Sequence, residues 1–223
     1  MVNRFGAPPR PVLPLPVPAI WMLCVLALAS AGLIGAVLAG EGAVAFDDPV
    51  RDWMLERRTG TATTVATAVT HAGGGMVTTL VAALAAVLLV RRGHGWPAGL
   101  ILVAAVGAQP LSNVSKILID RDRPPTGDHL VQVASQSFPS GHSLGSFVVA
   151  TVLAVVAVAG CSGRALRSAI AGAAAIFVVA VGLSRIYLGV HWPTDVLGGW
   201  SMGAVWVGLC LLGYRATTTA RAA

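Results

Sequence analysis

The residues best suited to chemistry lie in three short clusters in the second half of the chain. Together the clusters supply three fixed cations, two histidines and one carboxylate placed to orient a histidine. The clusters are Lys116 to Arg123-Pro124, Pro139-Ser140-Gly141-His142, and Ser184-Arg185 followed by His191 and Asp195. Groups of these types can hold a phosphoryl group and transfer it through a histidine. The clusters therefore predict a phosphate site with a histidine nucleophile.

The first cluster places two cations at the end of an apolar stretch. Lys116 and Arg123 are seven residues apart, about two helical turns, so they share one face if the helix continues. Pro124 disfavours helical backbone at Arg123, which leaves that continuity open. Two cations on one face favour anion binding. The alternative is that both side chains only reach from a membrane span to the interface.

The second cluster begins another apolar stretch. Ser140, Gly141 and His142 would offer a hydroxyl, backbone N–H groups and an imidazole at the positive end of a helix, where an anion is favoured. His142 could act as a general acid, because the pKa of an ordinary histidine lies near neutrality. The alternative is that Ser140 caps the helix and His142 is incidental.

The third cluster offers a nucleophile and its partner. Asp195 follows His191 by four residues, and Pro193 between them suits the first turn of a helix. A carboxylate on one ring nitrogen selects the tautomer and leaves the other nitrogen free to attack. Arg185 adds a cation at the end of the preceding apolar stretch. The alternative is an ordinary polar helix cap.

The composition predicts that these clusters belong to a membrane protein. Hydrophobic residues make up 56% of the 223 residues and charged residues 11%, against about 25% charged in soluble domains. This excludes a soluble enzyme, a disordered chain and a nucleic-acid binder, so no nucleic-acid partner is expected. Six apolar stretches have the length of about 20 residues that crosses a bilayer as a helix. They are 18–40, 72–90, 96–118, 141–160, 168–188 and 194–214.

The predicted fold is all-α, an integral membrane six-helix bundle with its active site at the outer membrane face. The side that holds both termini carries arginines and no acidic residue, whereas all nine acidic residues lie on the other side with the three clusters. Basic loops favour the cytoplasm, so we expect cytoplasmic termini in the plasma membrane and a site facing the periplasm or exterior. The expected parts are a Pro-rich tail over 1–17, the six-span domain over 18–214 with motifs at 116–124, 139–142 and 184–195, and a tail over 215–223.

Two features outside the clusters predict further elements. The segment VRDWMLERR at 50–58 favours a short interfacial helix anchored by Trp53, with a surface loop as the alternative. His71 followed by Gly73–Gly75 predicts a bend near the outer interface. His129 lies between the first two clusters, where it could touch a substrate, although an ordinary loop histidine is favoured.

No metal site or other cofactor is expected. Asp120-Arg121-Asp122 has the pattern D-x-D, but the arginines beside the carboxylates favour salt-linked loop charges over a bound cation. The three cysteines are widely spaced in or beside apolar stretches, which favours small buried side chains over disulfides or metal ligands.

The three clusters resemble the signature motifs of the type-2 phosphatidic acid phosphatase family. The resemblance covers Lys116-x6-Arg123-Pro124, Pro139-Ser140-Gly141-His142 and Ser184-Arg185-x5-His191-x3-Asp195, with every motif position matched in order. It implies a metal-independent phosphatase with a six-helix core. His191 would be the nucleophile, Asp195 its partner and His142 the acid that protonates the leaving oxygen. The phosphoryl oxygens would be held by Lys116, Arg123, Ser140, the Gly141 amide and Arg185.

The expected substrate is an amphiphilic phosphorylated lipid taken from the surrounding membrane lipids. The Ala-, Gly- and Arg-rich composition is typical of high-GC bacteria, whose cell wall needs polyprenyl diphosphate recycled on the outer face. That lipid (undecaprenyl or decaprenyl diphosphate) is therefore favoured, with phosphatidic acid and phosphatidylglycerophosphate as alternatives. A phosphotransferase using the same histidine also stays open. The sequence does not predict the oligomeric state.

Two other classes are disfavoured. Vanadium haloperoxidases carry related motifs but are soluble-type proteins, which six spans argue against. A channel or transporter would be expected to carry charges near the middle of its spans, whereas here they cluster at span ends.

Overall fold

The computed structural model describes residues 17–220, and this part of the chain is helical with no β-strand. The Pro-rich segment lies almost wholly outside the described residues. In chain order the elements are α1 (Val17–Ala39), the 3₁₀ helix η1 (Gly42–Phe46), α2 (Asp47–Glu56), α3 (Gly60–Ala72), α4 (Gly75–Arg91), α5 (Gly95–Ile119), the 3₁₀ helix η2 (Thr126–Asp128), α6 (Gly141–Ala159), α7 (Arg164–Tyr187) and α8 (Pro193–Ala220).

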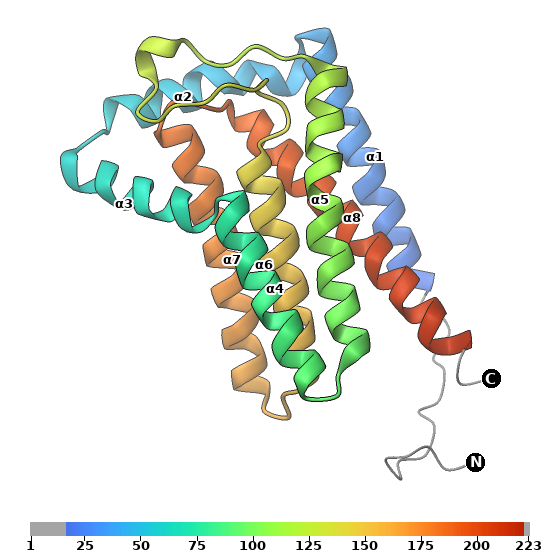
Figure 1. The fold of residues 1–223 in the computed structure, drawn as a ribbon. Helices are drawn as coiled ribbons and strands as arrows, with labels where there is room; N and C mark the ends of the chain where they lie inside the picture. Colours follow the sequence, from blue (N-terminus) through green and yellow to red (C-terminus); the bar gives the residue numbers. More distant parts are fainter. Residues whose placement is uncertain (1–16, 221–223) are drawn as a thin grey trace, which may run out of the picture.

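Helix α6 lies at the centre of the bundle and packs on α4, α5, α7 and α8, while α1 packs on α8 at one side (Figure 1). The core between α4, α5, α6 and α8 is made of small and medium apolar side chains, as in many membrane bundles. Close approach of α5 and α8 depends on Gly107, because a β-carbon there would lie 2.1 Å from the Trp206 ring. The Trp206 indole N–H donates to the Ala104 carbonyl at 2.9 Å and fixes this contact.

The prediction of an all-α membrane protein is confirmed. Five helices are long and apolar enough to cross a membrane, and the number rises to six if the bent pair α3 and α4 forms one span. The expected span 72–90 falls on α4, whose 17 residues make it shorter than the other five. The last expected span ended at 214, but α8 continues to Ala220, since no glycine or proline follows Gly213 to stop it.

Two shorter features also match the sequence prediction. A helix, α2, does form in the segment around Trp53, and that side chain is 52% exposed with the Arg57 guanidinium 4.3 Å from its ring centroid. Helices α3 and α4 meet at a 48° bend at the glycine run after His71. Figure 1 shows α2 and α3 running across the bundle instead of along it.

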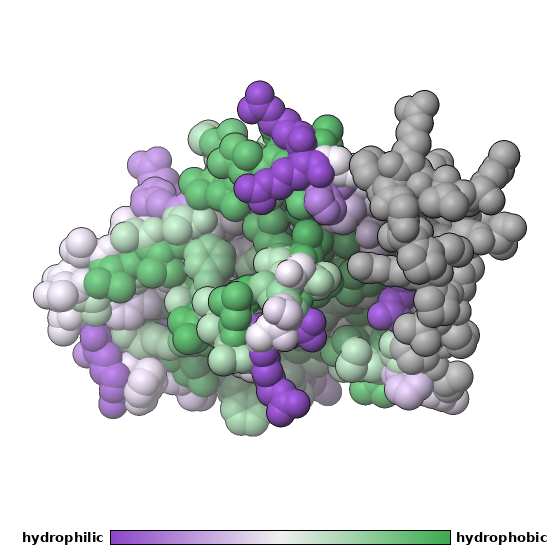
Figure 2. All heavy atoms as spheres, turned by 90° about the horizontal axis from the view of Figure 1, so that it is seen from below, coloured by the Kyte–Doolittle hydropathy of each residue, from purple (hydrophilic) through white to green (hydrophobic). Residues whose placement is uncertain are grey.

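The two ends of the bundle differ in charge. At the upper end in Figure 1, α5 and α7 end and α6 and α8 begin, and all nine acidic residues lie in or next to these segments and α2. At the lower end, the described turns and helix ends carry only arginines among their Asp, Glu, Lys and Arg side chains. Figure 2, which views the lower end, shows separate hydrophilic side chains among apolar ones.

Candidate active site

The three sequence clusters meet at the upper end of the bundle, around His191. This residue lies in the short connection between α7 and α8, and only 2% of it is exposed. Its Nδ1 is 3.1 Å from the Asp195 Oδ2, and its Nε2 is 3.2 Å from Nη1 of Arg123. The expected contact between His191 and Asp195 is therefore present, because α8 begins at Pro193 and turns Asp195 back towards the ring.

The Asp195 carboxylate is fully buried and accepts from four directions. Besides His191, its partners are the Arg121 guanidinium at 2.7 Å, the Ser137 hydroxyl and the Trp192 backbone N–H at 2.9 Å. Such a set of donors fixes the carboxylate in one orientation. Asp195 can therefore accept a hydrogen bond from the Nδ1 proton of His191, which leaves Nε2 unprotonated.

Lys116 and Arg123 come together through a loop, because the helix does not continue to Arg123 and the condition for a shared helical face is not met. Helix α5 ends at Ile119, and Asp120 takes a left-handed conformation with φ of 46° that turns the chain away. Both cations instead donate to the carbonyl of Gln136, from Lys116 Nζ and from Arg123 Nη2. The loop 120–140 thus gathers two cations that the helix alone would separate.

Arg185 approaches the same region from the end of α7. Its Nη1 donates to the Thr70 hydroxyl of α3 at 2.7 Å, and both residues are buried. Its Nε has no hydrogen-bond partner among the described residues, although it is buried. Lys116, Arg123 and Arg185 interact electrostatically with one another, so the site concentrates positive charge.

The start of α6 forms another wall of the site. Ser140 is the N-cap, and its hydroxyl accepts from the Ser143 N–H at 3.4 Å and from the Ser143 hydroxyl at 2.9 Å. The Ser140 N–H donates to the Asp195 carbonyl at 3.0 Å, which joins this cluster to α8. Gly141 follows as the first helical residue and faces Ser112 of α5. The motif positions Ser140 and Gly141 therefore lie beside the pair formed by His191 and Asp195.

His142 lies on α6 beside the bend between α3 and α4. A β-carbon at Gly74 would lie 3.6 Å from the His142 Nε2, so the glycine run leaves room for this ring. His142 also interacts electrostatically with the three cations Lys116, Arg123 and Arg185. The predicted bend thus contributes to the site itself.

The charge state of His191 follows from its surroundings. The pKa of His191 is lowered from 6.5 to about 3, chiefly by burial; the guanidinium groups of Arg123 and Arg185 act in the same direction, and Asp195 opposes them. Burial also lowers the pKa of Arg123 from its ordinary value. The His191 ring is therefore neutral near pH 7, as attack through Nε2 requires.

Sequence reasoning missed Thr70, Ser137 and the part played by Arg121. Arg121 bridges two carboxylates, Asp195 at 2.7 Å and Asp47 at 2.6 Å. Among the described residues neither Asp120 nor Asp122 forms a salt bridge, so the salt links expected within this loop give way to links from Arg121 to distant segments. No local pattern marks a threonine or serine that acts through a contact far along the chain. Asp47 was missed too, because it lies just before the segment 50–58 in which a helix was expected, whereas α2 begins at Asp47 itself.

The remaining polar candidates have structural partners. His129 donates from Nε2 to the Pro124 carbonyl at 3.0 Å, which steadies the loop after Arg123. Across residues 17–220, no three His, Cys, Asp or Glu side chains lie close enough together to hold a metal ion. The three cysteines are all free thiols.

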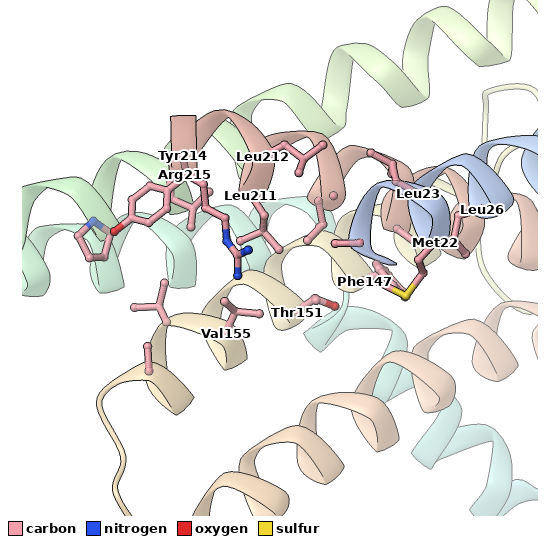
Figure 3. Close-up of a pocket in the computed structure, with 18 residues that line it drawn as sticks. Met22, Leu23, Leu26, Phe147, Thr151, Val155, Leu211, Leu212, Tyr214 and Arg215 are labelled. Atoms are coloured by element: carbon pink, nitrogen blue, oxygen red, sulfur yellow. The ribbon is translucent and has the colours of Figure 1, made fainter. Parts of the chain in front are cut away.

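An apolar groove lies away from the polar cluster. It has a volume of about 640 Å³ and runs between α1, α6 and α8 towards the lower end of the bundle. Figure 3 shows its apolar lining, with Met22 of α1 beside Phe147 of α6, and with Arg215 of α8 directed towards Val155 of α6. This groove suits hydrocarbon chains, whereas the motif residues suit a phosphate.

The fold and the site together define a helical multi-pass membrane protein with a buried cluster of cations around a histidine–carboxylate pair. The family model of the PAP2 superfamily matches residues 95–218, and the chain belongs to this superfamily. The resemblance read from the three motifs is confirmed.

Three curated relatives are phosphatases. Phosphatidylglycerophosphatase B of Bacillus subtilis is 42% identical over 110 residues, which are 47% of this chain and 52% of that protein. Decaprenylphosphoryl-5-phosphoribose phosphatase of Mycobacterium tuberculosis is 34% identical over 134 residues, covering 56% and 64%. Undecaprenyl-diphosphatase of Sulfolobus acidocaldarius is 31% identical over 112 residues, covering 48% and 50%. The matches thus span between half and two thirds of the length of these relatives.

Two solved structures share the fold. The transmembrane PAP2 type phosphatidylglycerolphosphate phosphatase from Bacillus subtilis has a TM-score of 0.80 and 29% identity, covering 86% of this chain and 96% of that chain. Aquifex aeolicus LpxE has a TM-score of 0.58 and 21% identity over 75% of this chain and 95% of that chain, which supports the fold alone.

Proposed function

We propose that this protein is a membrane lipid phosphatase that works through a phospho-histidine at His191 and needs no metal ion. The observation that carries the proposal is the environment of His191. One ring nitrogen lies against a fixed carboxylate, and the other lies 3.2 Å from a guanidinium that can bind the phosphoryl oxygens. A neutral histidine with this orientation is an activated nucleophile.

In the first step, the lone pair on His191 Nε2 forms a bond to phosphorus while the bond from phosphorus to the leaving oxygen breaks. His142 donates a proton to that oxygen, and the lipid leaves as an alcohol or a monophosphate. Lys116, Arg123 and Arg185 stabilise the charge on the equatorial oxygens, together with the Ser140 hydroxyl and the Gly141 N–H. Asp195 stabilises the histidine as it gains positive charge.

In the second step, water attacks the phospho-histidine. His142 takes a proton from that water, the bond from phosphorus to nitrogen breaks, and its electron pair returns to Nε2. Inorganic phosphate then leaves, and the site regains its starting protonation. The three cations do the charge stabilisation that metal ions provide in many other phosphatases.

The substrate class follows from position and charge. A phosphate reaching a cluster of three cations at one end of a membrane bundle belongs to an amphiphile lying in the same membrane. The names of the relatives favour phosphatidylglycerophosphate and polyprenyl-linked phosphates. Polyprenyl diphosphate, which the sequence favoured, stays a prediction beside phosphatidylglycerophosphate and phosphatidic acid.

The orientation we propose has the lower end in the cytoplasm and the site facing the exterior of the plasma membrane. Its support is the contrast in charge between the ends, since the described lower turns carry Arg91, Arg92, Arg164 and Arg167 and no acidic residue. Short loops rich in arginine favour the cytoplasmic side.

The test is phosphate release by the detergent-purified protein in excess EDTA. The panel contains polyprenyl diphosphate, phosphatidic acid and phosphatidylglycerophosphate, and His191→Ala is compared with the wild type. We expect release that EDTA does not affect and that the variant lacks. Loss of release in EDTA, or release by His191→Ala near the wild-type rate, would overturn the mechanism. Product analysis with an added alcohol separates hydrolysis from transfer to an acceptor.

A further inference from the structure

Asp47 is a buried acidic residue outside the three motifs. It begins α2, next to the membrane interface, yet only 2% of it is exposed. Its Oδ1 accepts from the Thr194 backbone N–H at 2.8 Å, and its Oδ2 accepts from the Thr194 hydroxyl at 2.6 Å. Thr194 lies in the first turn of α8, where backbone N–H groups have no partner within the helix. Asp47 therefore caps, from another element, the turn that carries Asp195.

The same carboxylate holds one arm of Arg121. Asp47 Oδ2 accepts from Arg121 Nη2 at 2.6 Å, while Nη1 of the same guanidinium donates to Asp195 Oδ1 at 2.7 Å. The Arg121 guanidinium also lies 5.6 Å from the centroid of the Trp192 ring. Arg121 is thus fixed between two carboxylates, and of its two terminal nitrogens only Nη1 donates to Asp195.

This arrangement affects the contact between Asp195 and His191, the proposed nucleophile. Asp195 must share its negative charge between His191 and Arg121, and Asp47 compensates the cation on the far side. If Asp47 were neutral, Arg121 would turn more fully towards Asp195 and compete with His191 for the carboxylate. His191 would then lose part of the interaction that fixes its tautomer and stabilises it as it becomes positive.

We propose that Asp47 is a positioning residue for the phosphoryl-transfer reaction, which acts through Arg121 to keep the Asp195 carboxylate directed at His191. This inference rests on the proposed function, since it assigns the residue to the same reaction. The Asp47 side chain contacts Thr194 and Arg121 and not the His191 ring. It should therefore affect the chemical step and leave lipid binding nearly unchanged.

The kinetic test compares Asp47→Asn with Asp48→Asn. Asp48 is the neighbouring residue on α2, its side chain is 74% exposed, and its contact to Arg51 is a surface pair at 3.5 Å. We expect Asp47→Asn to lower kcat roughly tenfold to a hundredfold, as for a displaced catalytic group, with KM within about twofold of the wild type. Asp48→Asn should match the wild type. Equal kcat values for the two variants would overturn the inference.

The double variant tests the route of the effect. If Asp47 acts through Arg121, then Asp47→Asn combined with Arg121→Gln should have the kcat of Arg121→Gln alone. Multiplication of the two single effects would show independent roles and overturn the inference. If Asp47→Asn does not fold, Asp47→Glu, which keeps the charge and moves it by one methylene, enters the same cycle.

A spectroscopic measurement separates this inference from the proposed function. In protein with ¹⁵N-labelled histidine, the signals of His191 are identified among the five histidines by their loss in His191→Gln. The wild type and Asp48→Asn should show Nδ1 protonated and Nε2 unprotonated, and Asp47→Asn should show a mixture of tautomers. An unchanged tautomer in Asp47→Asn would contradict the inference. This result does not depend on turnover, so an inactive wild type would overturn the proposed function alone.

Discussion

The contact between Thr70 and Arg185 gives the sharpest prediction about the phosphate site. Thr70 lies on α3, outside the three motifs, and within residues 17–220 its hydroxyl is the hydrogen-bond acceptor of the guanidinium of Arg185, a residue that is 3% exposed. Thr70→Val keeps nearly the same volume and removes the hydroxyl, so it leaves Arg185 without this acceptor. We expect Arg185 to lose its fixed orientation and to bind the phosphoryl oxygens less well.

The size of the effect follows from the geometry. A hydrogen bond to a charged group contributes about 1.5–3 kcal/mol, and the distance of 2.7 Å between buried atoms places this one among the strong ones. Because each 1.4 kcal/mol corresponds to a factor of ten, kcat/KM should fall by roughly tenfold and at most about a hundredfold. The remaining part of the lost hydrogen-bond free energy would lower the stability of the fold, because the contact between Thr70 and Arg185 is also present without substrate.

The assay is phosphate release from the best lipid of the panel, with kcat and KM measured separately. Thr70→Ser keeps the hydroxyl and should retain most of the activity. Thr64→Val makes the same change at an exposed position on α3, where the hydroxyl only donates to the Gly60 carbonyl, and should match the wild type. Activity of Thr70→Val within about twofold of the wild type would refute the reasoning, and so would equal losses in Thr70→Ser and Thr70→Val.

Three further predictions concern the charge, the stability and the orientation of the protein. Lys116→Arg should lower kcat/KM about tenfold, which corresponds to the loss of one charge-assisted contact. The reason is that a planar guanidinium cannot replace the ammonium group that donates to the carbonyls of Gln136 and Ser137. An unchanged kcat/KM across the lipid panel would argue against a contact between Lys116 and the phosphate. The pKa of His191 is about 6.5 in the unfolded chain and about 3 in the folded protein. As the pH falls below 6.5, the wild type should therefore lose up to about 1.4 kcal/mol of unfolding free energy per pH unit, and His191→Gln should not show this loss. Tm curves of the two proteins that run parallel between pH 6.5 and 4.5 would contradict this. Cys161, in the lower turn between α6 and α7, should react with an impermeant maleimide only after cells are permeabilised, and labelling in intact cells would reverse the proposed orientation.

The helices could be predicted from the sequence because the bilayer imposes a length and a composition on each span. The starts of α5, α6 and α8 lie within one residue of the expected spans. Helix α7 begins at Arg164, four residues before the expected span 168–188. The larger difference is in the region of α3 and α4, where a polar helix and a short apolar one join at the glycine run after His71. Hydropathy alone detects the apolar half of this pair and not the half that contains Thr70.

The site could be predicted only as far as local patterns reach. The contact of His191 with Asp195 spans four residues, so helical periodicity was enough to expect it. The meeting of Lys116 with Arg123 was expected only if the helix continued, and the structure brings them together through a loop and the Gln136 carbonyl instead. Contacts such as that of Arg185 with Thr70, 115 residues apart, have no sequence pattern of their own.

The distribution of these long-range contacts means that the motifs do not make the site by themselves. All three motifs lie within residues 95–218, which match the family model, whereas Asp47, Thr70 and Gly74 precede them. Without α2 and α3, Arg185 would lose its hydroxyl acceptor and Arg121 would lose one of its two carboxylates. The cation cluster would keep its composition and lose its geometry, and catalysis by fixed charges depends on that geometry. The N-terminal half of the chain therefore helps to position the candidate site, although it carries none of the motif residues.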